Sequence, residues 1–203
     1  MRRIVLLTVF ELSACAVATS PGYMGPNIAP TAVTKSRQQY RGFSVEPPTG
    51  VGWYVNISEQ TPLRATYRLT LKPVTHTFIA GVGLVQLDKS VPLQEALIPH
   101  AADNPERNQV LEETHELDTS RKIQCIRYSI RLLDKGAPNS GGAALYLIDR
   151  GFVCAHPTMP GMAVRASFSE RGTESELDPN LWGTFDVFLQ SVHIESAPGV
   201  PVA

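Results

Sequence analysis

The sequence predicts an α+β fold in which two main helices pack on one mostly antiparallel sheet. Several short segments alternate apolar and polar side chains, which is the period of half-buried strands. Two other segments place their apolar residues at helical spacing. The turns between the strands are short, and short connections favour antiparallel neighbours. With 203 residues and 43% hydrophobic content, the chain is long enough for one domain with its own core.

Four strands are expected in the first half of the folded region, at residues 41–46, 52–57, 65–71 and 77–87. The last of these segments is apolar on both of its faces, which predicts a central strand. Gly81 and Gly83 interrupt it, so a bulge or a close contact with a neighbouring backbone is expected there.

A first helix is expected to begin at Ser90 and Pro92, to carry apolar residues as far as Ala101 and to end before Pro105. Further strands follow at residues 110–117, 126–132, 144–155 and 162–169, with a loop at 134–142. The segment 110–117 is charged, which is typical of an edge strand.

The second helix is the best defined element of the prediction. Asp178 is a suitable N-cap, and Pro179 occupies the first helical position. One broad apolar stripe follows, with Trp182 at its edge and Leu181, Phe185, Phe188, Leu189 and Val192 along it. This stripe is expected to pack against the sheet.

Residues 1–14 have the layout of a secretory signal peptide. Arg2 and Arg3 give a positive start, residues 4–10 are apolar, and small residues precede a cleavage site. The apolar run is too short to span a bilayer. Secretion is therefore the expected fate of the chain.

The residues Leu12-Ser13-Ala14-Cys15 resemble the lipobox of bacterial lipoproteins. The resemblance implies cleavage before Cys15, a diacylglycerol thioether on its sulfur and acylation of the new amine. Ala16 in the next position implies sorting to an outer membrane, facing the periplasm, in a cell that has one. Two alternatives stay open: an ordinary signal peptide cleaved after Ala16, and a chance cysteine in a cytosolic protein.

The sequence divides into four regions. The signal peptide at 1–14 is followed by the lipidated cysteine and a flexible tether at 15–39, which is rich in Pro, Gly, Ala, Ser and Thr. A single globular α+β domain is expected at 40–195, and a frayed tail at 196–203.

Cys125 and Cys154 remain as a pair once Cys15 is lipidated. They lie on two strands that flank the loop 134–142, nearly equidistant from its centre. Facing residues of an antiparallel hairpin approach within disulfide range, so a structural disulfide is expected. Free thiols, or a redox or metal-binding pair, are the alternatives.

No catalytic motif is found, and the chain is expected not to be an enzyme. The histidines are His76, His100, His115, His156 and His193, and no two have the spacing of a helical metal pair. We therefore expect no cofactor and no metal. Trp53 and Trp182 are interpreted as core or core-edge residues, and as candidate binding anchors if they are exposed.

The expected function is that of a lipid-anchored envelope protein that binds another protein or an envelope component. The alternatives are an envelope enzyme or a small-ligand carrier whose site forms only in three dimensions. A net charge of −1 without a basic run disfavours nucleic acid as a partner. The segment from Pro47 to Trp53 and the order of elements resemble the PsbP/Mog1-type sandwich, which implies an α/β/α arrangement over residues 40–195.

Overall fold

The computed structural model describes residues 31–32, 36–50, 52–58, 64–71, 75–99, 105–137 and 140–195. The signal peptide, Cys15 and the C-terminal tail lie outside these residues, so the predictions made for them stay predictions. Among the described residues, no helix combines the length and the apolar composition needed to cross a bilayer.

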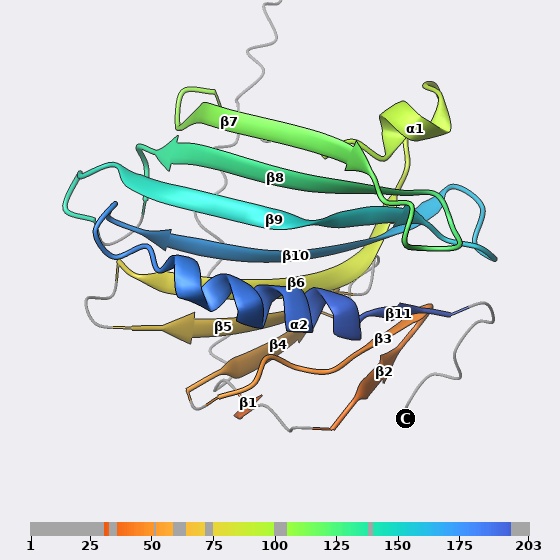
Figure 1. Cartoon of the computed structure of the whole chain (residues 1–203), viewed down its shortest axis with the longest axis horizontal. Coiled ribbons are helices and arrows are strands. Elements are labelled where there is room, and N and C mark those ends of the chain that lie inside the picture. Colours follow the sequence, from red (N-terminus) through yellow and green to blue (C-terminus); the bar gives the residue numbers. More distant parts are fainter. Residues whose placement is uncertain are drawn as a thin grey trace, which may run out of the picture.

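An eight-stranded sheet forms the body of the domain (Figure 1). Its strands, in spatial order, are β1 (Thr31–Ala32), β4 (Tyr54–Ser58), β5 (Arg64–Thr70), β6 (Thr77–Gln86), β10 (Met162–Gly172), β9 (Leu145–Ala155), β8 (Cys125–Asp134) and β7 (Asn108–Leu117). Every pairing between these neighbours is antiparallel. The mostly antiparallel sheet predicted from the sequence is therefore confirmed, and 77–87 is indeed a central strand.

A second, three-stranded sheet contains β11 (His193–Ile194), β3 (Phe43–Val45) and β2 (Gln38–Tyr40). Strands β1 and β2 lie in the range predicted as tether, so strand pairing begins before residue 40. The small sheet and the second helix lie against one face of the large sheet (Figure 1), which we call the helix face.

The second helix begins as predicted. Asp178 is the N-cap, Pro179 opens a 3-10 turn at Pro179–Leu181, and α2 (Trp182–Ser191) continues it. Its Phe185 stacks on Phe168 of β10, and Phe188 meets the same ring edge-on. Phe168 is 1% exposed, so this aromatic cluster is the centre of the core.

The first helix is far shorter than predicted. α1 covers only Leu93–Ala96, and its N-cap Pro92 offers no side-chain hydrogen bond. Pro99 explains the early end, because a proline disfavours helical backbone in the residue before it. The expected continuation to Ala101 is therefore wrong up to residue 99, and Ala101 itself lies outside the described residues.

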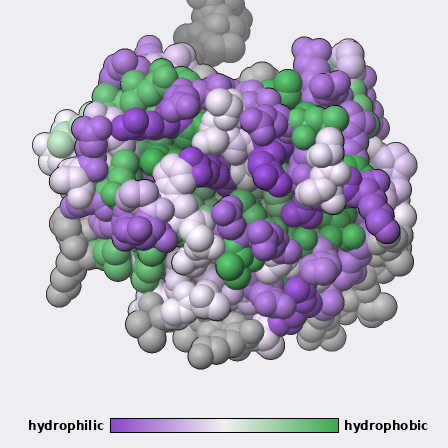
Figure 2. All heavy atoms as spheres, viewed as in Figure 1, coloured by the Kyte–Doolittle hydropathy of each residue, from purple (hydrophilic) through white to green (hydrophobic). Residues whose placement is uncertain are grey.

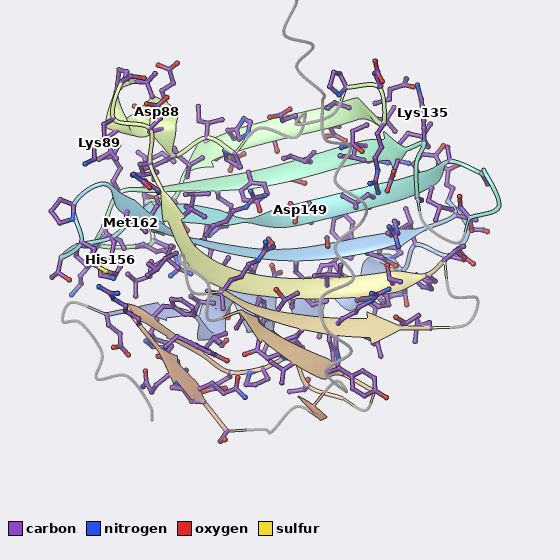
Figure 3. The ribbon with its side chains drawn as sticks, turned by 180° about the vertical axis from the view of Figure 1, so that it is seen from behind. Asp88, Lys89, Lys135, Asp149, His156 and Met162 are labelled. Carbon is purple, nitrogen blue, oxygen red and sulfur yellow. A yellow bond between two sulfur atoms is a disulfide. The ribbon has the colours of Figure 1, made fainter. Side chains whose placement is uncertain are left out.

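The other side of the large sheet, which we call the opposite face, has its own apolar cluster around β8. It contains Leu87, Leu97, Ile126, Tyr128, Ile130, Leu132, Val153 and Ala163. Leu97, directly after α1, closes one end of the cluster and is fully buried. The middle of the opposite face carries Asp149 (Figure 3), and Arg165, Ser167 and Ser169 line a groove with it there.

The predicted disulfide is confirmed. Cys125 and Cys154 face each other in the ladder of β8 and β9, and a disulfide joins them with their Cα atoms 4.0 Å apart. The register continues through Gly151 without a bulge. Both cysteines are fully buried on the helix face, so the bond staples two neighbouring strands beneath the core.

Candidate functional site

The helix face is only partly covered by α2, and a groove of about 380 Å³ remains between the helix and strands β7, β8 and β9. We call it the α2 groove. Figure 2 shows hydrophilic side chains interspersed with hydrophobic ones over this part of the face. Three cations and three anions line the groove: Arg121, Arg127, Arg150, Glu116, Asp118 and Asp186. Its walls are charged, but its net charge is close to zero.

Asp118 anchors one end of the α2 groove. Its carboxylate lies 3.3 Å from Arg127 and 3.6 Å from Arg121, and the residue is only 7% exposed. Burial alone would raise its pKa, but hydrogen bonds from Ser120 and the charge of Arg127 hold the pKa below its usual value. Asp118 is therefore a fixed negative charge in this wall.

Arg150 forms the other wall of the α2 groove and covers Trp182. Its guanidinium carbon lies 3.2 Å from the centre of the indole ring, which is a cation–π contact. The Nε of Arg150 is buried and has no hydrogen-bond partner among the described residues. Trp182 is therefore half-buried beneath Arg150 and packs against the core, and it does not line the groove. Trp53 is 7% exposed and belongs to the core.

Strand β7 is the outer edge of the large sheet beside the α2 groove, as its charge predicted. Among the described residues it pairs only with β8, so the other side of its ten-residue backbone has no strand partner. Leu111 and Leu117 are 45% and 57% exposed on it. The strand contains three glutamates and neither lysine nor arginine.

A second groove, of about 350 Å³, lies on the opposite face over strands β5, β6, β10 and β9. We call it the glycine groove, because Gly81 and Gly83 lie in its floor. Its polar lining residues are Arg64, Asp149, Arg165, Ser167 and Ser169.

Asp149 is the centre of a buried polar network in the glycine groove (Figure 3). Its Oδ2 accepts hydrogen bonds from the Tyr128 hydroxyl and from Arg165 Nη2, each at 3.3 Å. Arg165 Nε also donates to the Tyr128 oxygen at 3.2 Å. Burial raises the pKa of Asp149 to about 6, and burial together with the charge of Asp149 raises the pKa of Tyr128.

A further buried pair joins β10 to the start of α2. Glu170 is fully buried, and its Oε1 lies 2.9 Å from Nε2 of His76 and accepts from the backbone N–H of Asp178 at 3.0 Å. This pair positions the 3-10 turn before α2 and belongs to no groove named above. Sequence reasoning missed it because the two side chains lie 94 positions apart.

Cys154 and His156, which lie two positions apart in the sequence, each have a structural role in the fold. Cys154 is in the disulfide, and Nδ1 of His156 accepts from the backbone N–H groups of Thr158 and Met159. Its Nε2 lies 3.1 Å from the Gly42 carbonyl oxygen, and burial lowers the pKa of the ring. His156 therefore caps a turn and ties it to the small sheet.

The acidic residues of β7 and the turn after it (Glu112, Glu113, Glu116 and Asp118) do not lie on one face of the sheet. The ladder with β8 places Glu112 and Glu116 on the helix face and Glu113 on the opposite face, where its Oε1 lies 3.2 Å from His115 Nε2. Within the part of the chain that the structure describes, no three His, Cys, Asp or Glu side chains converge to hold a metal ion.

Comparison with known proteins assigns no family to this chain. No family model matches it, and no curated protein matches it.

Proposed function

We propose that this chain is a lipid-anchored envelope protein that acts by binding an extended segment of another envelope protein. The observation that carries the proposal is the edge strand β7, whose outer side is free among the described residues and adjoins the α2 groove. A free edge accepts an added strand through backbone hydrogen bonds.

The proposed location rests on the start of the sequence. Leu12-Ser13-Ala14-Cys15 resembles a lipobox, and acylation of Cys15 would hold the domain at a membrane, with the outer membrane as the proposed site. The Cys125–Cys154 disulfide supports this location, because such bonds persist in oxidising compartments.

The charges of β7 indicate the chemistry of the partner. Glu112, Glu113 and Glu116 project from the edge strand on its two faces. A basic residue on an added strand would lie opposite such a glutamate, and opposite charges across strands stabilise pairing. The proposed partner segment is therefore extended and carries lysine or arginine.

Binding fits the described site better than catalysis. Asp118 of the α2 groove is paired with Arg121 and Arg127, and Cys154 is in the disulfide. We also propose that the domain is a variant of the PsbP/Mog1-type sandwich, with α2 on the helix face and the short α1 segment against the opposite face. The packing of Leu97 in the opposite-face cluster supports this arrangement.

Photo-crosslinking in intact cells tests the proposed interface. A photoreactive residue at Leu111 of β7 should trap one partner, whereas the same residue at Tyr54, near the far edge of the sheet, should not. Both positions are 45% exposed, so accessibility does not distinguish them. Mass spectrometry of the mature N-terminus in the same preparation should find diacylglycerol on Cys15.

A charge reversal makes the test specific. Glu113→Lys should abolish crosslinking from Leu111, while Glu95→Lys on the exposed side of α1 should leave it unchanged. Equal crosslinking from Leu111 and Tyr54, or crosslinking that survives Glu113→Lys, would refute the edge as the binding site. An unmodified Cys15 would refute the anchor independently of the interface.

A further inference from the structure

The glycine groove contains a glycine that neither packing nor backbone conformation requires. A Cβ built on Gly81 would have its nearest neighbours at 3.7 Å (Arg64 Nη2) and 3.9 Å (Ala65 O and Ser167 Oγ), which are ordinary contacts. Gly81 also lacks the positive φ that favours glycine elsewhere in the chain. Glycine inside a strand is destabilising, so its presence needs another reason.

Gly151, in the neighbouring part of the sheet, shows the contrast. A Cβ there would overlap the Ala166 carbonyl oxygen, so the close approach of β9 and β10 requires glycine. No such contact constrains Gly81. A side chain at position 81 would occupy the space of the groove.

Asp149 supplies the second, independent observation. Its side chain is only 17% exposed, and its Oδ1 is buried without a hydrogen-bond partner among the described residues. Its other oxygen, Oδ2, is held by Tyr128 and Arg165. A buried carboxylate oxygen without a partner is unfavourable, which indicates a missing hydrogen-bond donor.

The charges of the groove restrict the class of that donor. Asp149 is the only acidic residue among those that line the groove, and Arg64 and Arg165 lie beside it. A cation would face these two guanidinium groups, and a simple anion would face the free oxygen of Asp149. Neutral hydroxyl groups both donate and accept, so they match the acceptor and the surrounding donors together.

We propose that the glycine groove binds a neutral saccharide, with Asp149 Oδ1 accepting from a sugar hydroxyl and Gly81 leaving room for the ring. Arg64 is the donor placed to meet a sugar oxygen. Ser169 Oγ donates to the Ile79 carbonyl oxygen, so its own oxygen can accept from a sugar hydroxyl. The volume of about 350 Å³ lies at the lower end of the range for ligand pockets, which fits a small ligand.

The site is arranged for binding and lacks the groups for hydrolysis. Hydrolysis of a glycosidic bond by the common mechanisms needs a pair of carboxyl groups on either side of that bond. Among the described residues that line the glycine groove, Asp149 alone carries a carboxyl group. The site also lies on the face away from α2, so it is separate from the α2 groove and can be tested independently of the proposed partner protein.

Titration with three monosaccharides that differ in charge tests the proposal. The mature full-length protein, in a detergent without a sugar headgroup, is titrated with N-acetylglucosamine, which is neutral, with glucuronate, an anion, and with glucosamine, a cation. Backbone amide NMR signals of β6 and β10 report binding. We expect N-acetylglucosamine to shift the signals of Gly81, Gly83 and Ser167 and the two charged sugars to bind more weakly.

Two variants and a matched control locate the site. Gly81→Ala fills the floor without a clash, and it should weaken binding by occupying the space of the ring. Asp149→Asn replaces the free acceptor, and it should weaken binding about tenfold or more, the scale of a lost hydrogen bond to a charged group. Gly183→Ala, on α2 with nothing within 4 Å of the added Cβ, should bind as the wild type does.

Four outcomes would overturn the proposal. These are tighter binding of glucuronate, tighter binding of glucosamine, no saturable shift with N-acetylglucosamine up to about 50 mM, and unchanged affinity in Gly81→Ala. An unchanged unfolding midpoint of Gly81→Ala shows that its loss of binding is steric and does not come from misfolding.

Discussion

Strands β9 and β10 present opposite chemistry on their two faces. On the helix face, Phe152 and Phe168 are buried in the core with α2 and the small sheet. On the opposite face of the same two strands, Gly151 pairs with Ser167 and Asp149 pairs with Ser169. The same backbone therefore supports an apolar core on one side and a buried polar network on the other. The helix face stabilises the fold, whereas the polar residues of the opposite face line the proposed saccharide site.

The largest effect is expected on the helix face. Phe168→Ala should lower the free energy of unfolding by about 3–5 kcal/mol, because Phe168 is 1% exposed and contacts four other aromatic rings. Ser167→Ala, the adjacent residue on the opposite face, should cost less than about 1 kcal/mol. Urea unfolding of the non-reduced protein, followed by circular dichroism, measures both.

Equal losses in Phe168→Ala and Ser167→Ala would contradict this division of roles. The disulfide must be intact in both variants, since Cys125 and Cys154 lie in the same core as Phe168. Thiol titration of each unfolded sample verifies this.

A smaller effect is expected on the opposite face, as a dependence on pH. Burial raises the pKa of Asp149 to about 6, whereas an unfolded aspartate titrates near 3.9. Between these values the folded protein holds the proton that the unfolded chain has lost. The free energy of unfolding should therefore fall by about 2 kcal/mol as the pH rises from about 4 to about 6.

Asp149→Asn should remove this pH dependence. Asp88→Asn is the matched control, because Asp88 is exposed and hydrogen bonds from Ser90 lower its pKa, so it does not titrate between pH 4 and 6. Urea unfolding of both variants across this range is the measurement. A slope that persists in Asp149→Asn would show that another group titrates there.

The sequence predicted those features that depend on residues close together along the chain or on one hairpin. The loop between Cys125 and Cys154 fixed their register, the charges of residues 110–117 indicated an edge strand, and Asp178 with Pro179 marked a helix start. The length of the first helix was overestimated because the helical spacing of the apolar residues continues past Pro99, whereas α1 ends at Ala96.

The sequence could not assemble the glycine groove, because its network comes from three strands. Tyr128, Asp149 and Arg165 lie on β8, β9 and β10, and only the register of both ladders brings them together. The segment that contains Asp149 has apolar residues on both faces of the strand. Its sequence pattern therefore did not indicate a polar site. Arg165 joins this network through Asp149 Oδ2, which no local pattern in the sequence indicates.

The smallest effect is expected where α2 begins. The side chain of Asp178 accepts from the backbone N–H of Asn180 at 2.8 Å, and Asp178→Ala should lower the free energy of unfolding by about 1 kcal/mol. Asp178→Asn keeps a capping oxygen and should retain most of the stability. The same urea measurement compares the two variants with the wild type.

The stability of Asp178→Ala shows whether the N-cap or the aromatic packing holds α2 on the sheet. The backbone N–H of residue 178 still donates to Glu170 in the alanine variant, so only the side-chain cap is removed. If packing of Phe185 and Phe188 holds α2 in place, losing the cap frays one turn and costs far less than Phe168→Ala. A loss from Asp178→Ala as large as that from Phe168→Ala would mean that α2 depends on its start, and that the aromatic core forms only after the helix is capped.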